Sequence, residues 1–201
     1  MATSATPHGF RPVGLLGGGD WTSSVRHMKV TNSYGTSIFY GDVVKVVAAG
    51  TVEKDTGTTA MTPVGIFVGC SYTDPSTSQP TYSQMWTAST VATDIQAYVV
   101  DDPNVVFQAQ GDATLAQTAL GNNVAVVQTA GSTSIGHSKN AIDSSTIAAT
   151  KTLPVRILGF IDGPNSAVGD SFTDILCKFN SGGDATGDSC ASHQWQDTTG
   201  I

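Results

Sequence analysis

The sequence predicts an all-β fold, an antiparallel β-sandwich or barrel that is jelly-roll-like or related to it, with one short helix. Short runs rich in Val, Ile and Phe alternate with turns rich in Gly, Asp and Pro. Charged residues make up only 12% of the chain, about half the ~25% of ordinary soluble domains, so hydroxyl side chains supply much of the polar surface. We expect a single β domain over residues 36–180, between an extended N-terminal arm (1–35) and a C-terminal tail (181–201).

The first 35 residues predict an arm without a long regular element. Pro7 and Pro12 remove backbone donors, and the glycines at 17–19 raise the cost of ordering the chain. The arm nevertheless carries apolar and aromatic side chains, which a solvated linker would not need: Phe10, Val13, Leu15, Leu16 and Trp21. We therefore expect the arm to pack on a surface, either of its own chain or of a neighbour.

Residues 36–49 predict a strand that is covered on both faces, because apolar residues occupy both alternating positions. A tight turn or a bulge is expected at Gly41-Asp42. A second strand is predicted over 63–72, where Pro63 stands at the first position and its missing donor is tolerated.

The second half of the chain predicts further strands and the one helix. Residues 112–121 have the features of a short helix, with Asp112 as its cap and Gly121 as its stop. Two stretches are predicted to be polar connections. Residues 129–152 form a long one, and residues 74–90 form either a long loop or an edge hairpin. Strands are expected over 93–100, 104–110, 122–128, 153–161 and 171–180.

The charge balance argues against two classes of partner. The chain has 9 Lys and Arg against 16 Asp and Glu, for a formal net charge of -7. With no basic cluster to offset that charge, nucleic-acid binding and binding to an anionic membrane are not expected. No segment approaches the ~18 apolar residues of a membrane span. The first residues lack a basic stretch followed by an apolar one, so the sequence predicts no secretory signal and synthesis in a cytoplasm.

The chain has three cysteines, Cys70, Cys177 and Cys190. Because this number is small and odd, the sequence does not predict a disulfide framework. Cys70 and Cys177 lie in apolar runs and are expected to be buried. Cys190 lies in a tail rich in Gly, Asp and Ser, where it is either a free thiol or the partner of Cys177 in a loop-closing disulfide.

No motif predicts catalysis or a cofactor. The four histidines have no second His or Cys at metal-ligand spacing, and Cys190 with His193 makes half a site at most, so no metal site is expected. Asp101 and Asp102 precede Pro103, which is typical of a turn rather than of an acid–base pair. Nucleophile-elbow, P-loop and dinucleotide-binding patterns do not occur. We therefore expect a protein that is not an enzyme.

Several motifs resemble one viral protein family. "YGDVVKV" at 40–46, "GTV" at 50–52 and "PVGIFVGCSYTD" at 63–74 resemble the small head-decoration, or cement, proteins of tailed bacteriophages. Those proteins commonly show G-D-x-V, then a glycine turn, then P-V-G-I leading into a strand. The start "PHGFRPVG" looks like a phage protein type encoded beside the major capsid protein. Similar to that type are "TDIQAYVVDDPNVVFQAQ", "TLAQTALG" and the closing "HQW…TGI".

The resemblance implies a structural protein of the virion. Its place would be the outer surface of the capsid, after synthesis in the host cytoplasm. Its partner would be the major capsid protein, whose subunit contacts it would stabilise, and its own state would be a homotrimer over local threefold positions.

Within this interpretation, the candidate binding residues are aromatic and Arg side chains, because these typically dominate interface energies. They are Phe10, Arg11, Pro12 and Trp21 in the arm and Trp195 in the tail. In the alternative, Phe10 and Trp21 cover the edge of their own sheet instead.

A rival function is a carbohydrate-binding or host-adhesion module on the virion surface. Its site would be the polar segment 74–90, where Tyr82 and Trp86 are expected to be exposed and could stack on sugars.

Overall fold

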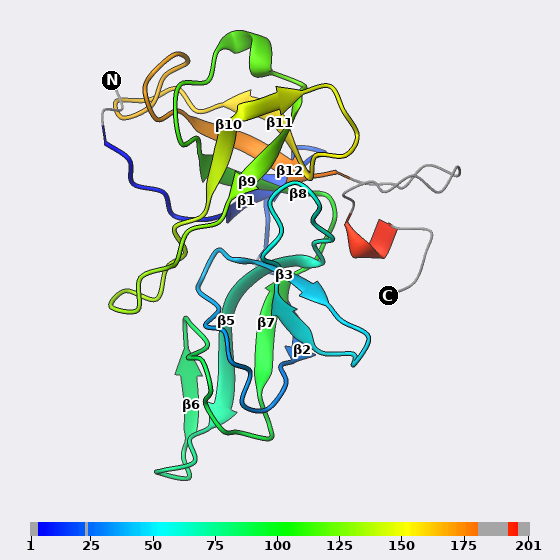
Figure 1. The fold of residues 1–201 in the computed structure, drawn as a ribbon, viewed down its shortest axis with the longest axis vertical. Coiled ribbons are helices and arrows are strands. Elements are labelled where there is room, and N and C mark those ends of the chain that lie inside the picture. Colours follow the sequence, from blue (N-terminus) through cyan, green and yellow to red (C-terminus); the bar gives the residue numbers. More distant parts are fainter. Residues whose placement is uncertain (1–3, 23, 181–192, 197–201) are drawn as a thin grey trace.

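The computed structural model describes residues 4–22, 24–180 and 193–196. Its fold is all-β, with two six-stranded antiparallel sheets packed against each other as in a β-sandwich, which confirms the predicted fold class. One sheet forms the upper part of Figure 1 and the other the lower part. We call them sheet A and sheet B.

Sheet A is formed by six strands that pair only antiparallel. Their spatial order is β1 (Arg11–Leu15), β8 (Val105–Gln110), β12 (Asp174–Phe179), β11 (Val155–Phe160), β9 (Asn123–Val127) and β10 (Ala141–Ala148). The strands expected over 104–110, 122–128, 153–161 and 171–180 are all present. The edges of the sheet are β1 and β10, and each of these pairs with one neighbour.

Sheet B is organised around the nine-residue strand β5 (Gly65–Thr73), which matches the strand predicted over 63–72. Strand β7 lies along one edge of β5, while β3 pairs with the start of β5 and β6 with its end. The other strands are β2 (Arg26–Lys29), β3 (Val43–Val46), β4 (Val52–Lys54), β6 (Pro80–Ser83) and β7 (Gln96–Val100), and the order of the main path is β2-β7-β5-β3-β4.

Two apolar cores stabilise the molecule. The first lies under sheet A and also includes Val43, Ile66 and Val100, from strands of sheet B, so it joins the two sheets. The second belongs to sheet B and contains Ile38 and Val44. Residues of the 38–44 stretch therefore reach both cores, and the expectation that its two faces are covered is met.

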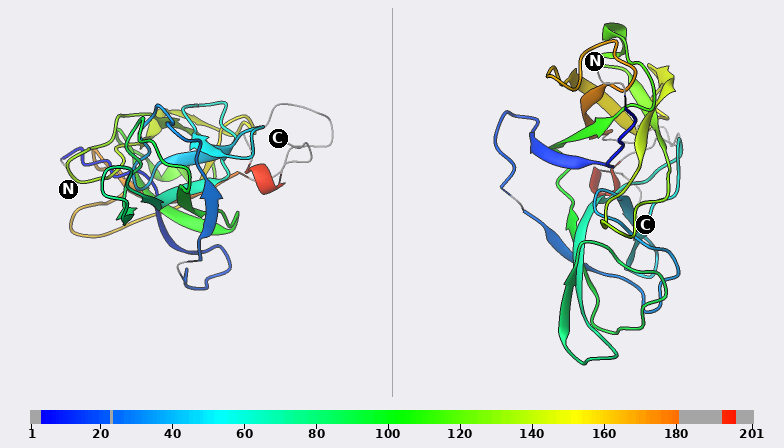
Figure 2. Two further views of the ribbon diagram at one scale, coloured as in Figure 1. Left: turned by 90° about the horizontal axis from the view of Figure 1, so that it is seen from below. Right: turned by 90° about the vertical axis from the view of Figure 1, so that its left-hand side faces the viewer.

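The N-terminal segment is less irregular than its prolines and glycines predict. It contributes β1 to sheet A and β2 to sheet B, and residues 16–22, which follow β1, lie along one side of the molecule (Figure 2). The register of β1 against β8 shifts between Pro12 and Gly14. A shift at this point suits a residue that has no backbone donor for the ladder.

The predicted helix over 112–121 is wrong. The structure has one 3₁₀ turn there, η1 (Gln117–Ala119). The carboxylate of Asp112 accepts hydrogen bonds from the backbone N and the Oγ of Ser144, at 2.9 and 2.6 Å, instead of capping a helix. Leu115 is buried whereas Leu120 is exposed, so the apolar residues do not share one buried face.

The tail and the cysteines are described in part. In the tail, residues 193–196 include the 3₁₀ turn η2 (Gln194–Gln196). Cys70 and Cys177 are buried free thiols, as expected, and burial raises the pKa of both. Cys190 lies outside the described residues. No helix in the described parts of the chain is long and apolar enough to cross a membrane.

Candidate interaction site at the chain termini

The N-terminal segment enters the fold through a close approach of three backbone stretches. Gly9 N donates to Asn140 O at 3.1 Å, and Phe10 N donates to Gly41 O at 3.0 Å. Gly9 has a φ of +71°, and a Cβ there would lie 2.5 Å from Gly41 O and 2.6 Å from Ser138 Cβ. Only glycine combines that φ with that space at no steric cost.

Asp42, of the predicted Gly41-Asp42 turn, fixes this junction from inside. Its carboxylate is fully buried and accepts hydrogen bonds from Phe39 N at 2.9 Å, Ser138 Oγ at 2.6 Å and Asn140 Nδ2 at 3.3 Å. Lys54 Nζ forms an ion pair with it at 2.9 Å. A buried carboxylate is stable only when it is paired and hydrogen-bonded, and this one is both. We call Asp42 and its four partners the Asp42 cluster.

Phe10 lies in the core of its own chain. It is fully buried, edge-on to Phe107 with ring centroids 6.3 Å apart, and 5.4 Å from Phe179. Its side chain is therefore not available to a partner in this structure. Phe10 therefore packs on its own sheet, which is the alternative expected for this residue from the sequence.

The other arm candidates lie on or next to β1, an edge strand of sheet A. Arg11 is exposed, Pro12 is half-buried, and Trp21 is half-buried against the first core. Sequence reasoning left two residues out of the candidate set: Val13 and Leu16, which expose 47% and 50% of their surface. Regular alternation from Arg11 does not identify Val13, because the register of β1 shifts between Pro12 and Gly14 and leaves Val13 unpaired.

The C-terminal segment is tied to sheet B. Gln194 Oε1 accepts a hydrogen bond from Val46 N at 2.7 Å, and Gln194 Nε2 donates to Val46 O at 2.9 Å. His193 is buried and its backbone N donates to Asn180 O. Burial lowers the pKa of His193 to about 4, and the nearby Asp101 and Asp102 oppose that shift without reversing it.

Trp195 is held at the surface by the predicted Asp101 turn. Its Nε1 donates to Asp101 Oδ2 at 2.7 Å, and Arg26 Nε donates to the same oxygen at 2.5 Å. The Arg26 guanidinium also lies 5.7 Å from the centre of the Trp195 ring. Trp195 still exposes 45% of its surface. Asp101 thus positions an aromatic side chain that a partner could reach.

The candidate sugar platform is not assembled. Tyr82, on β6, exposes 76% of its surface, but Trp86 is fully buried in the second core. Trp86 Nε1 donates to Tyr34 O at 3.2 Å, and its ring meets Tyr72 edge-on at 5.7 Å. The expectation that Trp86 is exposed is therefore wrong.

The Asp42 cluster holds the N-terminal segment in place, and Asp101 holds Trp195 at the surface. Over residues 4–22, 24–180 and 193–196, no group of three or more His, Cys, Asp and Glu side chains could hold a metal ion. No family model, curated protein or solved structure matches the chain.

Proposed function

We propose that the protein is a structural component of a phage virion, which binds the outside of the capsid and stabilises contacts between major capsid protein subunits. The observation that carries the proposal is the exposed edge strand β1. It pairs with β8 on one side only, and Arg11, Val13 and the adjacent Leu16 are exposed along it. A free strand edge offers backbone groups to a partner strand, while its side chains provide specificity.

A second exposed anchor supports binding at more than one point. Trp195, of the turn η2, and Arg26, of strand β2 in sheet B, form a contact pair outside β1. Trp and Arg are enriched among the residues that dominate interface energies. Two anchors on one rigid body raise the effective concentration at the second contact once the first is made.

Composition and resemblance agree with an exterior position. An excess of 16 acidic over 9 basic residues disfavours contact with packaged DNA. The motifs at 40–46 and 63–74 resemble those of head-decoration proteins. The proposal includes a homotrimer, which sedimentation equilibrium of the purified protein would measure.

The test is a decoration assay on capsids assembled from the major capsid protein of the same phage. The variant Val13→Asp/Leu16→Asp places one charge on β1 and one directly after it, at exposed positions outside both cores. Its matched control is Val91→Asp/Leu120→Asp, which changes apolar residues of similar exposure, 55% and 46%, elsewhere on the surface. We expect the first variant to bind at least tenfold more weakly, about 1.4 kcal/mol or more, and the control to bind normally. Normal decoration by a folded Val13→Asp/Leu16→Asp protein would refute the proposed role of β1.

The rival proposal of a carbohydrate-binding or host-adhesion module rests on Tyr82 alone, because Trp86 is buried. A glycan array with the native protein and Tyr82→Ala would test it. Glycan binding that Tyr82→Ala abolishes, with decoration unaffected, would favour this rival.

A further inference from the structure

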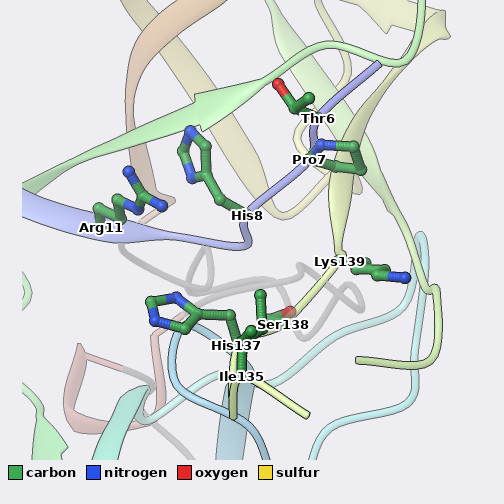
Figure 3. A pocket seen from close by; sticks show the side chains of 8 residues that line it. All are labelled: Thr6, Pro7, His8, Arg11, Ile135, His137, Ser138 and Lys139. Carbon is green, nitrogen blue, oxygen red and sulfur yellow. The ribbon is translucent and has the colours of Figure 1, made fainter. Parts of the chain in front are cut away.

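A cavity of about 460 Å³ opens where the N-terminal segment passes the loop before β10. It is lined from one side by Thr6, His8 and Arg11 and from the other by His137, Ser138 and Lys139. In Figure 3, His8 and Arg11 lie across the opening from His137, while Lys139 extends at the other end. The volume falls within the ~300–1,000 Å³ of small-molecule sites.

The charge of this cavity is opposite to that of the protein. The chain carries 9 Lys and Arg against 16 Asp and Glu, yet Arg11 and Lys139 line the cavity and no acidic residue does. Two of the four histidines, His8 and His137, line it as well. A concave surface lined by one sign of charge concentrates ligands of the other sign.

Two polar groups of the lining residues are without a partner in the described part of the protein, and one of them, the Arg11 guanidinium, belongs to an exposed residue. His8 Nδ1 donates to Gly9 O at 3.1 Å, but the buried Nε2 of His8 has no hydrogen-bond partner among the described residues. Arg11 is exposed and forms no ion pair with another described residue. Its guanidinium carries five N–H donors in a planar fork, which matches carboxylate and phosphate oxygens.

We propose that the cavity binds a small oxyanion with several acceptor oxygens, of the phosphate-ester or polycarboxylate class. Arg11 is the principal contact, and His137 faces it across the opening. Lys139 adds positive potential at the far end. The volume accommodates a ligand larger than a single inorganic ion, so more than one of these groups can bind it at once. This proposal stands independently of the capsid role.

Proton uptake by His8 should accompany binding. The neutral ring carries one hydrogen, on Nδ1, and no charge, so it attracts an anion less strongly than the protonated ring does. Burial, and then the charge of Arg11, lower the pKa of His8 below 6.5, while Asp174 of β12 opposes the shift. A bound anion would favour the protonated ring. His137 and Lys139 are the other titratable groups that line the cavity, so the His8 contribution must be isolated by substitution.

Isothermal titration calorimetry with sulfate and with citrate, at constant ionic strength, tests the proposal. Sulfate keeps its charge between about pH 5.5 and 7.5, the range in which histidine titrates. Any pH dependence of sulfate binding therefore comes from titration of groups on the protein. Tighter binding of citrate than of sulfate would assign the site to polycarboxylates, and the reverse order to phosphate-like groups. We expect saturable binding of at least one probe, and tighter sulfate binding at the lower pH by at most tenfold per pH unit.

The variants separate the site from the general field of the protein. Arg11→Gln should weaken binding about tenfold, equivalent to ~1.4 kcal/mol. His8→Gln should remove the part of the pH dependence that His8 contributes. Lys29→Gln, an exposed position on β2 in the other sheet, makes the same change in net charge as Arg11→Gln and should bind normally. The absence of saturable binding at millimolar concentrations of both probes would overturn the proposal. Equal weakening by Lys29→Gln and Arg11→Gln would also overturn it.

Discussion

Substitution of Asp42 by Asn should destabilise the protein more than any exposed Asp→Asn change. Four donors converge on this buried carboxylate: Phe39 N and Lys54 Nζ at Oδ2, both 2.9 Å, and Ser138 Oγ and Asn140 Nδ2 at Oδ1, at 2.6 and 3.3 Å. An Asn side chain has one acceptor oxygen and one NH₂ group, so one pair of donors would face another donor. Removing one partner of a buried ion pair costs ~3–5 kcal/mol. We expect a loss of that size, out of a typical total of ~5–15 kcal/mol.

Urea unfolding, followed by tryptophan fluorescence, measures the effect. A double-mutant cycle of Asp42→Asn with Lys54→Met isolates the ion pair, since methionine keeps the apolar stem of the lysine and removes its charge. The control is Asp112→Asn, an exposed carboxylate whose one hydrogen-bond partner among the described residues is Ser144, and for it we expect a loss of at most ~1 kcal/mol. If Asp42→Asn costs no more than Asp112→Asn, or if the cycle shows no coupling, the account of the Asp42 cluster is incorrect.

Two further predictions concern the anchors of the two termini. His193 has a pKa of about 4 in the folded protein, against an ordinary value of 6.5, so above pH 6.5 the ring is neutral in both states and this difference in pKa does not affect stability. As the pH falls from 6.5 toward 4, the unfolded chain takes up the proton first and up to ~3 kcal/mol of stability is lost. The urea midpoint of the native protein should fall over this window more steeply than that of His193→Gln, and parallel curves would contradict the prediction. Phe10→Ala should lower the free energy of unfolding by ~3–5 kcal/mol, whereas the exposed Val13→Ala should change it by less than ~0.5 kcal/mol; thermal unfolding compares them, and similar values for both would mean that Phe10 does not anchor the segment.

The central strands could be predicted from the sequence because they are buried. Strands β5 and β12 carry runs of apolar residues bounded by turns, and their burial is what the pattern records. The edge strands have a weaker hydrophobic pattern in the sequence. Strand β10 is rich in Ser and Thr, and β2 is mostly exposed, since each pairs with a single neighbour and buries little surface. Backbone hydrogen bonds to that neighbour, which the sequence does not encode locally, place these strands in their sheets.

The candidate site was harder to predict because distant contacts decide which side chains are exposed. Trp86 stands among polar residues in the sequence, yet its strand-like pairing with Ile38 places it inside the second core. Phe10 stands among glycine and proline, yet it packs against Phe107 and Phe179. The cavity combines His8 with His137, which no local spacing could indicate. Trp195 is partly exposed, and the Arg26 guanidinium lies beside its ring although the two residues are 169 positions apart in the sequence.

The position of the first strands has a consequence for folding during synthesis. Arg11 of β1 pairs with Gln108, and Arg26 of β2 pairs with Val99, so neither strand has a partner until about half of the chain has left the ribosome. Gln194 closes onto Val46 across 148 residues, so that contact forms only when the chain is nearly complete. Pairing over such distances slows folding, because the chain loses the conformational entropy of loop closure before any stabilising contact forms. The nascent chain therefore carries an apolar N-terminal segment without a partner for much of its synthesis, and this is the interval in which it is most exposed to aggregation.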